Sequence, residues 1–180
     1  MKNKGKIIFL CGITSSGKTT LVDAIQNTAE QFFYVVANDL MVQMVAEKYL
    51  EEDYWKYESR AIYYMYHMAK LLSDHGEHVL IDGCLLETPE LPGHYDTVKR
   101  IFADSPLYMV EVYCPLEICR QRNLAREDGR GEYQSHEQHA CWAQGVAYDI
   151  RVDTSEHTPE ECAEMILRSV IGGTQQGEIR

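Results

Sequence analysis

Hydrophobic residues along this chain of 180 residues gather in short runs, separated by stretches long enough to form helices. Five of these runs predict β-strands. They are Lys6–Cys11, Phe33–Ala37, Val79–Ile81, Leu107–Tyr113 and Ile150–Val152. A strand that is buried on both faces of a parallel sheet is continuously apolar, as Val79-Leu80-Ile81 is. The pattern therefore predicts βαβ units around a parallel sheet.

The polar and mixed intervals between the runs predict seven helices. They are Lys18–Glu30, Leu40–Leu50, Tyr54–Ser73, His94–Ala103, Pro115–Arg126, Tyr133–Gly145 and Pro159–Ile171. Pro115 and Pro159 suit first helical turns, and Thr158 suits the cap before the last helix. We expect a single α/β domain over residues 1–173, with a lid at about 126–133, followed by a polar tail over 174–180.

The strongest chemical signal is Gly12-Ile13-Thr14-Ser15-Ser16-Gly17-Lys18-Thr19, between the first predicted strand and the first predicted helix. Glycines at this spacing let backbone N–H groups converge on phosphates, and the helix adds the positive end of its dipole. We expect Lys18 to reach the β- and γ-phosphates of ATP and Thr19 to hold Mg²⁺. An incidental Gly/Ser-rich turn is the alternative, but its position between strand and helix favours a phosphate site. The predicted nucleotide-binding residues of this segment are Gly12, Thr14, Ser15, Ser16, Gly17, Lys18, Thr19 and Thr20.

Two aspartates follow apolar runs, at the edge of a parallel sheet where ligands bind. Asp39, just after the second run, is predicted to accept the proton of a substrate hydroxyl. Capping of the helix that starts at Leu40 is its alternative role. Asp82, at the end of the third run, is predicted to support Mg²⁺ or its water together with Thr19. A turn at Asp82-Gly83 or a contact with substrate is the alternative there.

Arginines recur every four residues at Arg122, Arg126 and Arg130. Their guanidinium groups match phosphate oxygens, and a lid over residues 126–133 would bring them onto ATP and exclude water. Arg122 and Arg126 are therefore predicted to bind the nucleotide. A solvated helix face paired with neighbouring acidic residues is the alternative. The predicted catalytic residues are Asp39, Lys18, Arg126 and Arg130.

Six aromatic residues gather within the predicted helix between Tyr54 and Tyr66. The helical spacing of Tyr57, Tyr64 and Met68 predicts that these three side chains belong to the core. The alternative is that some of the rings form a wall of the acceptor site.

The formal net charge of −11 argues against a protein that coats nucleic acid or an anionic membrane, because no basic stripe offsets it. Six widely spaced cysteines without metal-site spacing are predicted to be reduced. No apolar stretch reaches transmembrane length, so we expect a cytoplasmic protein. Only four cations lie between Asn38 and Leu72, which favours an uncharged or cationic acceptor.

Several of these segments together resemble the chloramphenicol phosphotransferase-like family. They are Ile8-Phe9-Leu10-Cys11-Gly12 leading into Ser15-Ser16-Gly17-Lys18-Thr19, Asn38-Asp39-Leu40, Leu80-Ile81-Asp82-Gly83, Arg122 through Arg130, and Tyr148-Asp149-Ile150-Arg151-Val152-Asp153-Thr154. The resemblance implies a three-layer P-loop NTPase fold of the nucleoside-monophosphate-kinase type, with a five-stranded parallel sheet flanked by helices. It also implies ATP-dependent phosphorylation of a small-molecule alcohol, Asp39 as base, and lid arginines on the phosphates. By the same resemblance, Asp153-Thr154-Ser155-Glu156 would lie beside the adenine.

Two other functions are compatible with the phosphate loop. One is a kinase for a nucleotide, a nucleotide sugar or another phosphorylated metabolite. The other is a non-catalytic ATP-binding switch. A GTPase is disfavoured because no Asn-Lys-x-Asp sequence follows the third predicted strand.

Overall fold

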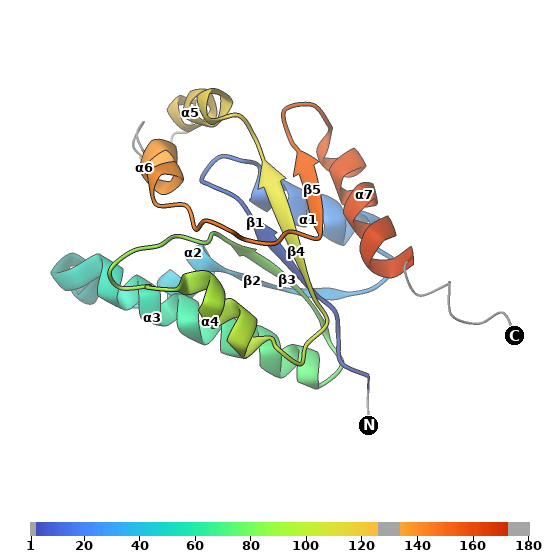
Figure 1. The fold of residues 1–180 in the computed structure, drawn as a ribbon, viewed down its shortest axis with the longest axis horizontal. Helices are drawn as coiled ribbons and strands as arrows, with labels where there is room; N and C mark the ends of the chain where they lie inside the picture. The colour runs from blue at the N-terminus through green and yellow to red at the C-terminus, as the bar shows by residue number, and fades with distance from the viewer. Residues whose placement is uncertain (1–2, 126–133, 173–180) are drawn as a thin grey trace, which may run out of the picture.

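A five-stranded sheet runs through the centre of the molecule in the computed structural model, which describes residues 3–125 and 134–172 (Figure 1). The strands are β1 (Ile7–Cys11), β2 (Phe33–Ala37), β3 (His78–Gly83), β4 (Leu107–Tyr113) and β5 (Ile150–Asp153). Their order is β2-β3-β1-β4-β5, and every pairing is parallel. The predicted five-stranded parallel sheet is confirmed. Strand β3 is longer than predicted, so Asp82 pairs within it, opposite Leu10 of β1.

Helices cover both faces of the sheet (Figure 1). They are α1 (Lys18–Thr28), α2 (Asn38–Val42), α3 (Glu47–Asp74), α4 (His94–Ile101), α5 (Leu116–Leu124), α6 (Gln134–Ala140) and α7 (Pro159–Ile171). Successive side chains of β1 alternate between the two faces. Phe9 belongs to the core beneath α3 and α4, whereas Ile8 and Leu10 belong to the core beneath α1 and α7.

Helices α5 and α6 lie beyond the carboxyl ends of the strands (Figure 1). The predicted helix over 133–145 is wrong in its second half, because α6 ends at Ala140. The chain then pairs with the segment after β3, where Trp142 bridges Leu86 and the Ala143 N–H donates to the Leu85 carbonyl at 3.0 Å. These long-range main-chain bonds replace the helical ones.

The predicted helix over 40–50 is also wrong, because α2 ends at Val42 and α3 begins at Glu47. Within α3, Asp53 has an extended backbone (φ −161°), and its carboxylate accepts a hydrogen bond from the Lys56 N–H at 3.2 Å. Asp53 therefore caps the longer second part of the helix, whose predicted start at Tyr54 follows directly.

The buried stripe of α3 differs from the predicted one. Tyr64 is 57 % exposed and Met68 is 39 % exposed, so their assignment to the core is wrong. The residues that face the sheet are Ala61, Ile62, Met65, Tyr66, Ala69 and Ser73. Their spacing also fits an α-helix, and packing against β1 and β3 selects this stripe over the other.

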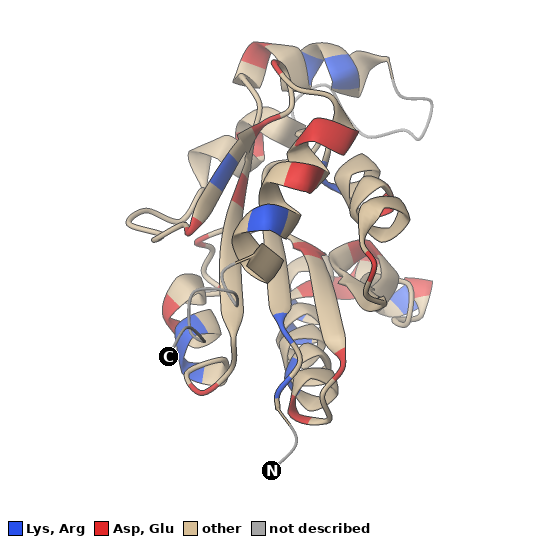
Figure 2. Ribbon diagram, turned by 90° about the vertical axis from the view of Figure 1, so that its right-hand side faces the viewer, with Lys and Arg blue, Asp and Glu red and all other residues tan. Residues whose placement is uncertain are grey.

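Helix α7 begins as predicted, with Thr158 as its cap. The Thr158 hydroxyl accepts a hydrogen bond from the Glu161 N–H, and the Glu161 carboxylate accepts one from the Thr158 N–H. Glu160 and Glu161 lie in the first turn of α7 and Arg168 lies in its last turn, which suits the helix dipole. Figure 2 shows basic residues in blue and acidic residues in red, distributed over several elements of the fold.

All six cysteines are free thiols, as predicted, and Cys11, Cys114, Cys119 and Cys162 are buried. Within residues 3–125 and 134–172, the helices lack the combination of length and apolar composition needed to cross a bilayer.

Candidate active site

The loop between β1 and α1 requires glycine at two positions, Gly12 and Gly17. A Cβ atom on Gly12 would lie 2.4 Å from the Ser16 hydroxyl and 2.6 Å from the Val112 carbonyl oxygen. Gly17 has a φ of 97°, in the left-handed region that glycine adopts without strain. The two glycines therefore let the backbone curl tightly and begin α1 at Lys18.

Ser15 holds the same left-handed conformation, with a φ of 60°, at an energetic cost for a residue with a side chain. Two residues of α5 stabilise it there. The Ser15 hydroxyl donates to the buried Asn123 side chain, whose amide donates in turn to the Ser135 hydroxyl at 3.0 Å. Arg122 donates to the Ser15 carbonyl at 3.4 Å. The loop conformation is thus supported by tertiary contacts.

Arg122 also ties the loop to the end of β5. Its guanidinium donates to the Thr154 hydroxyl at 3.1 Å and to the Thr154 carbonyl at 2.9 Å. The Thr154 hydroxyl donates to the Ser16 carbonyl at 2.6 Å. On the other side, the Thr14 N–H donates to the Gln138 side chain of α6 at 2.6 Å. Arg122 lies against the phosphate loop and contacts the Ser15 carbonyl, and its predicted contact with the nucleotide stays a prediction.

Two hydroxyl groups of the loop are buried without a hydrogen-bond partner in the part of the chain that the structure describes. They belong to Thr14 and Ser16. A buried polar group without a partner is costly, and it usually marks a place where a ligand or water binds. The first N–H groups of α1, which starts at Lys18, also lack partners within the helix. The loop therefore fits a group rich in acceptors, such as a phosphate chain.

Lys18, Thr19 and Asp82 meet beside this loop. The Thr19 hydroxyl donates to the Asp82 carboxylate at 2.9 Å, and the Lys18 ammonium lies 4.0 Å from the other oxygen of that carboxylate. Lys18 also donates to the carbonyls of Gly12 at 2.8 Å and Ile13 at 3.1 Å. A hydroxyl and a carboxylate at one point are oxygen donors of the kind that Mg²⁺ takes alongside phosphate oxygens. The residues present therefore fit the ion.

Asp39 lies at the same edge of the sheet. Ala37, the last residue of β2, pairs with Asp82 of β3, and Asp39 follows two residues later in the first turn of α2. The Asp39 side chain is exposed. Asn38 precedes it and donates to the Cys84 sulfur at 3.7 Å, beyond the end of β3. The structure thus brings Asp39 and Asp82 to neighbouring strand ends.

Glu58, on the sheet-facing side of α3, is a residue of this region that the sequence predictions missed. The Tyr54 hydroxyl donates to its carboxylate at 3.3 Å. Burial, together with the negative charge of Asp39, raises the pKa of Glu58 to about 7 despite this hydrogen bond. Burial also raises the pKa of Tyr54 to about 12, and the charge of Glu58 adds to that rise.

Both missed contributors, Glu58 and Asn123, carry a signal in the sequence. Glu58 precedes the buried Ile62 by one helical turn, and Asn123 follows the buried Cys119 by one turn. A polar residue in line with an apolar stripe is a candidate for a buried polar contact. The signal shows that such residues face inward, but the residues that they contact come from elsewhere in the chain.

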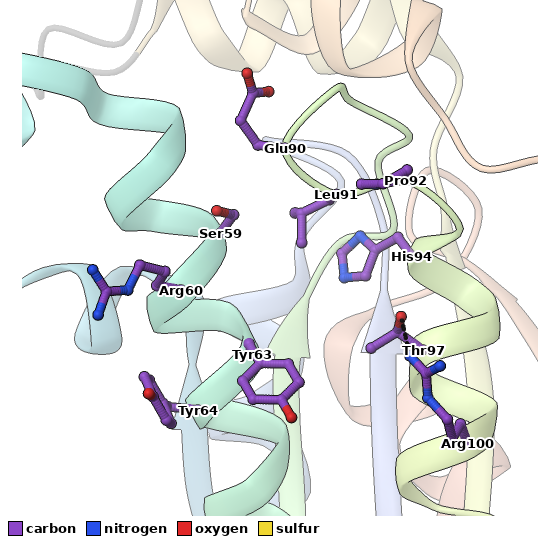
Figure 3. A pocket seen from close by; sticks show the side chains of 10 residues that line it. All are labelled: Ser59, Arg60, Tyr63, Tyr64, Glu90, Leu91, Pro92, His94, Thr97 and Arg100. Atoms are coloured by element: carbon purple, nitrogen blue, oxygen red, sulfur yellow. Dashed lines mark hydrogen bonds between the residues drawn. The ribbon is translucent and has the colours of Figure 1, made fainter.

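A groove of about 300 Å³ lies between α3 and α4, beside the segment 90–92 (Figure 3). Its lining residues are Ser59, Arg60, Tyr63, Tyr64, Glu90, Leu91, Pro92, His94, Thr97 and Arg100. None of the predicted site residues is among them. The His94 side chain at the base of the groove has a structural role, because its ring shares a hydrogen bond with the Tyr66 hydroxyl at 2.8 Å.

The predicted lid over 126–133, with Arg126 and Arg130, lies outside the described residues. Thr20, predicted to bind the nucleotide, lies in the exposed first turn of α1. Its role and those of the lid arginines stay predictions.

Comparisons with known proteins agree with this geometry. The sequence profile of the chloramphenicol phosphotransferase-like protein family matches residues 5–171. No curated protein sequence matches the chain significantly.

Solved structures with a similar fold include the APS kinase of Mycobacterium tuberculosis in complex with AMPPNP and APS. It has a TM-score of 0.70 and 17% identity, covering 93% of this chain and 98% of that one. A gluconokinase from Sinorhizobium meliloti 1021 has a TM-score of 0.65 and 14% identity, covering 99% and 100%. The shikimate kinase of Acinetobacter baumannii in complex with shikimate has a TM-score of 0.65 and 14% identity, covering 97% of each chain. The predicted phosphate-loop kinase fold is confirmed.

Proposed function

Because the chain belongs to the chloramphenicol phosphotransferase-like family, we propose that it is a kinase that transfers the γ-phosphate of ATP to a hydroxyl group of a small molecule. One observation carries the proposal. The loop that fits a phosphate chain, the Thr19–Asp82 pair and Asp39 all lie at the carboxyl edge of one parallel sheet. In open α/β sheets, ligands bind at this edge.

In the proposed reaction, the loop residues bind the β- and γ-phosphates, and Lys18 neutralises their charge. The acceptor oxygen forms a bond to the γ-phosphorus, while the bond from that phosphorus to the β–γ bridging oxygen breaks. ADP leaves with the electron pair, and the hydroxyl proton passes to the Asp39 carboxylate. Thr19 and Asp82 are the residues that would hold Mg²⁺, whose chemistry there is to offset phosphate charge.

Arg122 supports this chemistry by keeping the loop in place, and the arginines of the predicted lid, Arg126 and Arg130, would add charge from above. Most of the rate enhancement would come from positioning and electrostatics, since phosphoryl transfer needs little covalent help from the protein.

The test is ADP release in the presence of Mg²⁺ and ATP, measured with and without candidate alcohols. The set includes chloramphenicol, sugars, polyols, nucleosides and phosphorylated metabolites. A kinase shows ADP release that depends on one class of acceptor, and the phosphorylated product appears in equal amount. Turnover that no acceptor changes would instead indicate a nucleotide-dependent switch and contradict the proposal.

A further inference from the structure

The phosphate loop has a contact with α6 that the proposed reaction does not use. The Thr14 N–H donates to the side-chain oxygen of Gln138 at 2.6 Å, a bond between residues 124 positions apart in the sequence. Gln138 lies in α6 and is half-buried. When a protein oxygen takes one N–H group of such a loop, it determines which of the other N–H groups remain for a ligand.

The remaining N–H groups of the loop fall into two kinds. The Ser16 N–H has a protein partner, because it donates to the Ile13 carbonyl at 3.2 Å. The N–H groups of Ser15 and Gly17 have no hydrogen-bond partner in the part of the chain that the structure describes. These two groups are therefore available to phosphate oxygens, together with the first N–H groups of α1.

The direction of the Ser15 N–H depends on the backbone conformation of Ser15. Its φ of 60° lies in the left-handed region, which is unfavourable for a residue with a side chain. If φ relaxed to a negative value, the Thr14–Ser15 peptide would rotate and its N–H would point elsewhere. Gln138 fixes the backbone just before this peptide, and Asn123 fixes the Ser15 hydroxyl just after it. The two amide side chains thus hold the peptide from both sides.

Helix α6 is a firm support for Gln138. Near its start, the buried Ser135 hydroxyl accepts a hydrogen bond from the Asn123 amide of α5 at 3.0 Å. Just after its end, the Cys141 carbonyl accepts one from the Glu87 N–H at 2.7 Å. Figure 1 shows α5 and α6 near each other, beyond the carboxyl ends of the strands. Gln138 is therefore fixed relative to the loop, as a residue that shapes a binding site must be.

The side chain at position 138 also lies close to where phosphates would bind. Three bonds separate the backbone nitrogens of Thr14 and Ser15, so these two atoms are less than about 4 Å apart. A phosphate oxygen on the Ser15 N–H would thus lie within about 10 Å of the Gln138 side-chain oxygen. Over this distance a carboxylate repels phosphates at low salt. An amide oxygen satisfies the Thr14 N–H without that charge.

We propose that Gln138 is a positioning residue for nucleotide binding. Its uncharged amide holds the Thr14–Ser15 peptide so that the Ser15 N–H faces the phosphates of ATP. This inference rests on the proposed function, and it adds a residue of α6 to the nucleotide site and a requirement for an acceptor without charge at position 138.

Calorimetry with a non-hydrolysable ATP analogue and Mg²⁺ tests this role without knowledge of the acceptor. Gln138→Leu removes the acceptor of the Thr14 N–H, and we expect Kd to rise about tenfold at low salt. Gln138→Glu keeps an acceptor but adds a charge. We expect its Kd also to rise about tenfold at low salt, but to come within about threefold of the wild type at about 1 M salt. Its thermal unfolding temperature should stay within about 2 °C of the wild type.

Gln121→Leu and Gln121→Glu are the matched controls, because Gln121 is an exposed glutamine of the neighbouring helix α5. We expect both to bind the analogue as the wild type does. Hydrogen exchange of the Thr14 amide, followed by NMR, reports the contact itself. We expect exchange to be about tenfold faster or more in Gln138→Leu and close to the wild-type rate in Gln138→Glu.

Wild-type affinity in either Gln138 variant at low salt would overturn the inference while leaving the kinase function intact. An equal loss in Gln138→Glu at both salt concentrations would also overturn it, because misfit and not charge would then weaken binding. If the wild type binds the analogue but no acceptor stimulates ADP release, the kinase function fails, and the affinities still decide the role of Gln138. A wild-type protein that does not bind the analogue would contradict both.

Discussion

The Thr19 hydroxyl donates a hydrogen bond to the Asp82 carboxylate at 2.9 Å, which links the first turn of α1 to the end of β3. This contact places one hydroxyl and one carboxylate beside the phosphate loop. If the pair holds Mg²⁺, Asp82→Asn keeps the hydrogen bond but removes the charge that attracts the ion. We expect the Mg²⁺ concentration for half-maximal activity to rise about 10- to 100-fold.

The measurement is ADP release as a function of Mg²⁺ at constant ATP, with the best acceptor from the screen. Asp149→Asn is not a suitable control because the Asp149 carboxylate accepts a bond from the Met109 N–H at 2.7 Å. Asp96→Asn is suitable, since Asp96 is exposed and its partner Lys99 lies on the surface of α4. An Asp82→Asn protein with the Mg²⁺ dependence of the wild type would show that Asp82 does not support the ion.

Lys18→Ala removes the ammonium group that lies between the loop carbonyls and Asp82. Without it, charge that develops on the transferred phosphoryl group loses its nearest cation. We expect kcat to fall by about 10²–10³-fold or more, with a thermal unfolding temperature close to that of the wild type. Activity is measured by product formation and unfolding by circular dichroism. A kcat within threefold of the wild type, which corresponds to about 0.6 kcal/mol of activation free energy, would contradict the role of Lys18.

Asp39→Asn separates chemistry from nucleotide binding. The amide has almost the same shape as the carboxylate but cannot take the proton of the acceptor hydroxyl. We expect a loss of about 10²–10⁴-fold in kcat and an ATP affinity near that of the wild type. Calorimetry with a non-hydrolysable ATP analogue measures the affinity. An equal loss of affinity and activity would mean that Asp39 contributes to nucleotide binding, and full activity would exclude it as the base.

Local sequence pattern was sufficient for the sheet, for α7 and for the residues of the phosphate loop. The Gly12–Thr19 spacing and the apolar run before it specify strand, turn and helix within a single stretch of chain. Likewise, the cap at Thr158 forms with Glu161, only three residues away. Such features need no knowledge of distant segments.

Tertiary contacts decided the features that the sequence pattern missed. Residues after Ala140 leave the helix because the Ala143 main chain bonds to Leu85, which lies 58 positions earlier in the sequence. The α3 sequence offers two apolar stripes, and the sheet buries the one with Tyr66 while Tyr64 faces outward. Glu58 becomes half-buried in the same way, through packing that no local rule specifies.

Thr154→Val tests the link between the phosphate loop and the end of β5. The substitution keeps the side-chain shape but removes the hydroxyl that donates to the Ser16 carbonyl at 2.6 Å and accepts from Arg122 at 3.1 Å. Because partly buried groups then lose their partners, we expect the free energy of unfolding to fall by about 1–3 kcal/mol. A less ordered loop also binds ATP more weakly, by about tenfold.

Urea unfolding and calorimetry provide the two measurements. Arg122→Lys is a second variant that weakens the same link, and Arg168→Lys is its control. The Arg168 side chain is 81% exposed, and its guanidinium pairs with Glu164. A stable Thr154→Val protein with normal ATP affinity would show that the link has no part in shaping the loop.

Glu58→Gln is expected to stabilise the protein in a pH-dependent way. Burial and the charge of Asp39 raise the pKa of Glu58 from 4.5 to about 7 in the folded protein. Between these values the folded state binds a proton that the unfolded state has released, so the free energy of unfolding decreases as the pH rises through this range. Well above pH 7 the charge is present in full in both states, whereas well below pH 4.5 both states carry the proton. Glutamine has no charge to bury, and it should therefore raise the free energy of unfolding by about 1–3 kcal/mol at pH 8.5 and by almost nothing at pH 4.

Urea unfolding at the two pH values measures this difference, and Glu52→Gln, on the exposed side of the same helix, controls for the change in net charge. A gain of equal size at both pH values would mean that better packing, and not removal of a buried charge, stabilises the variant. A loss of stability at pH 8.5 would mean that the ionised carboxylate is itself well satisfied in the folded protein.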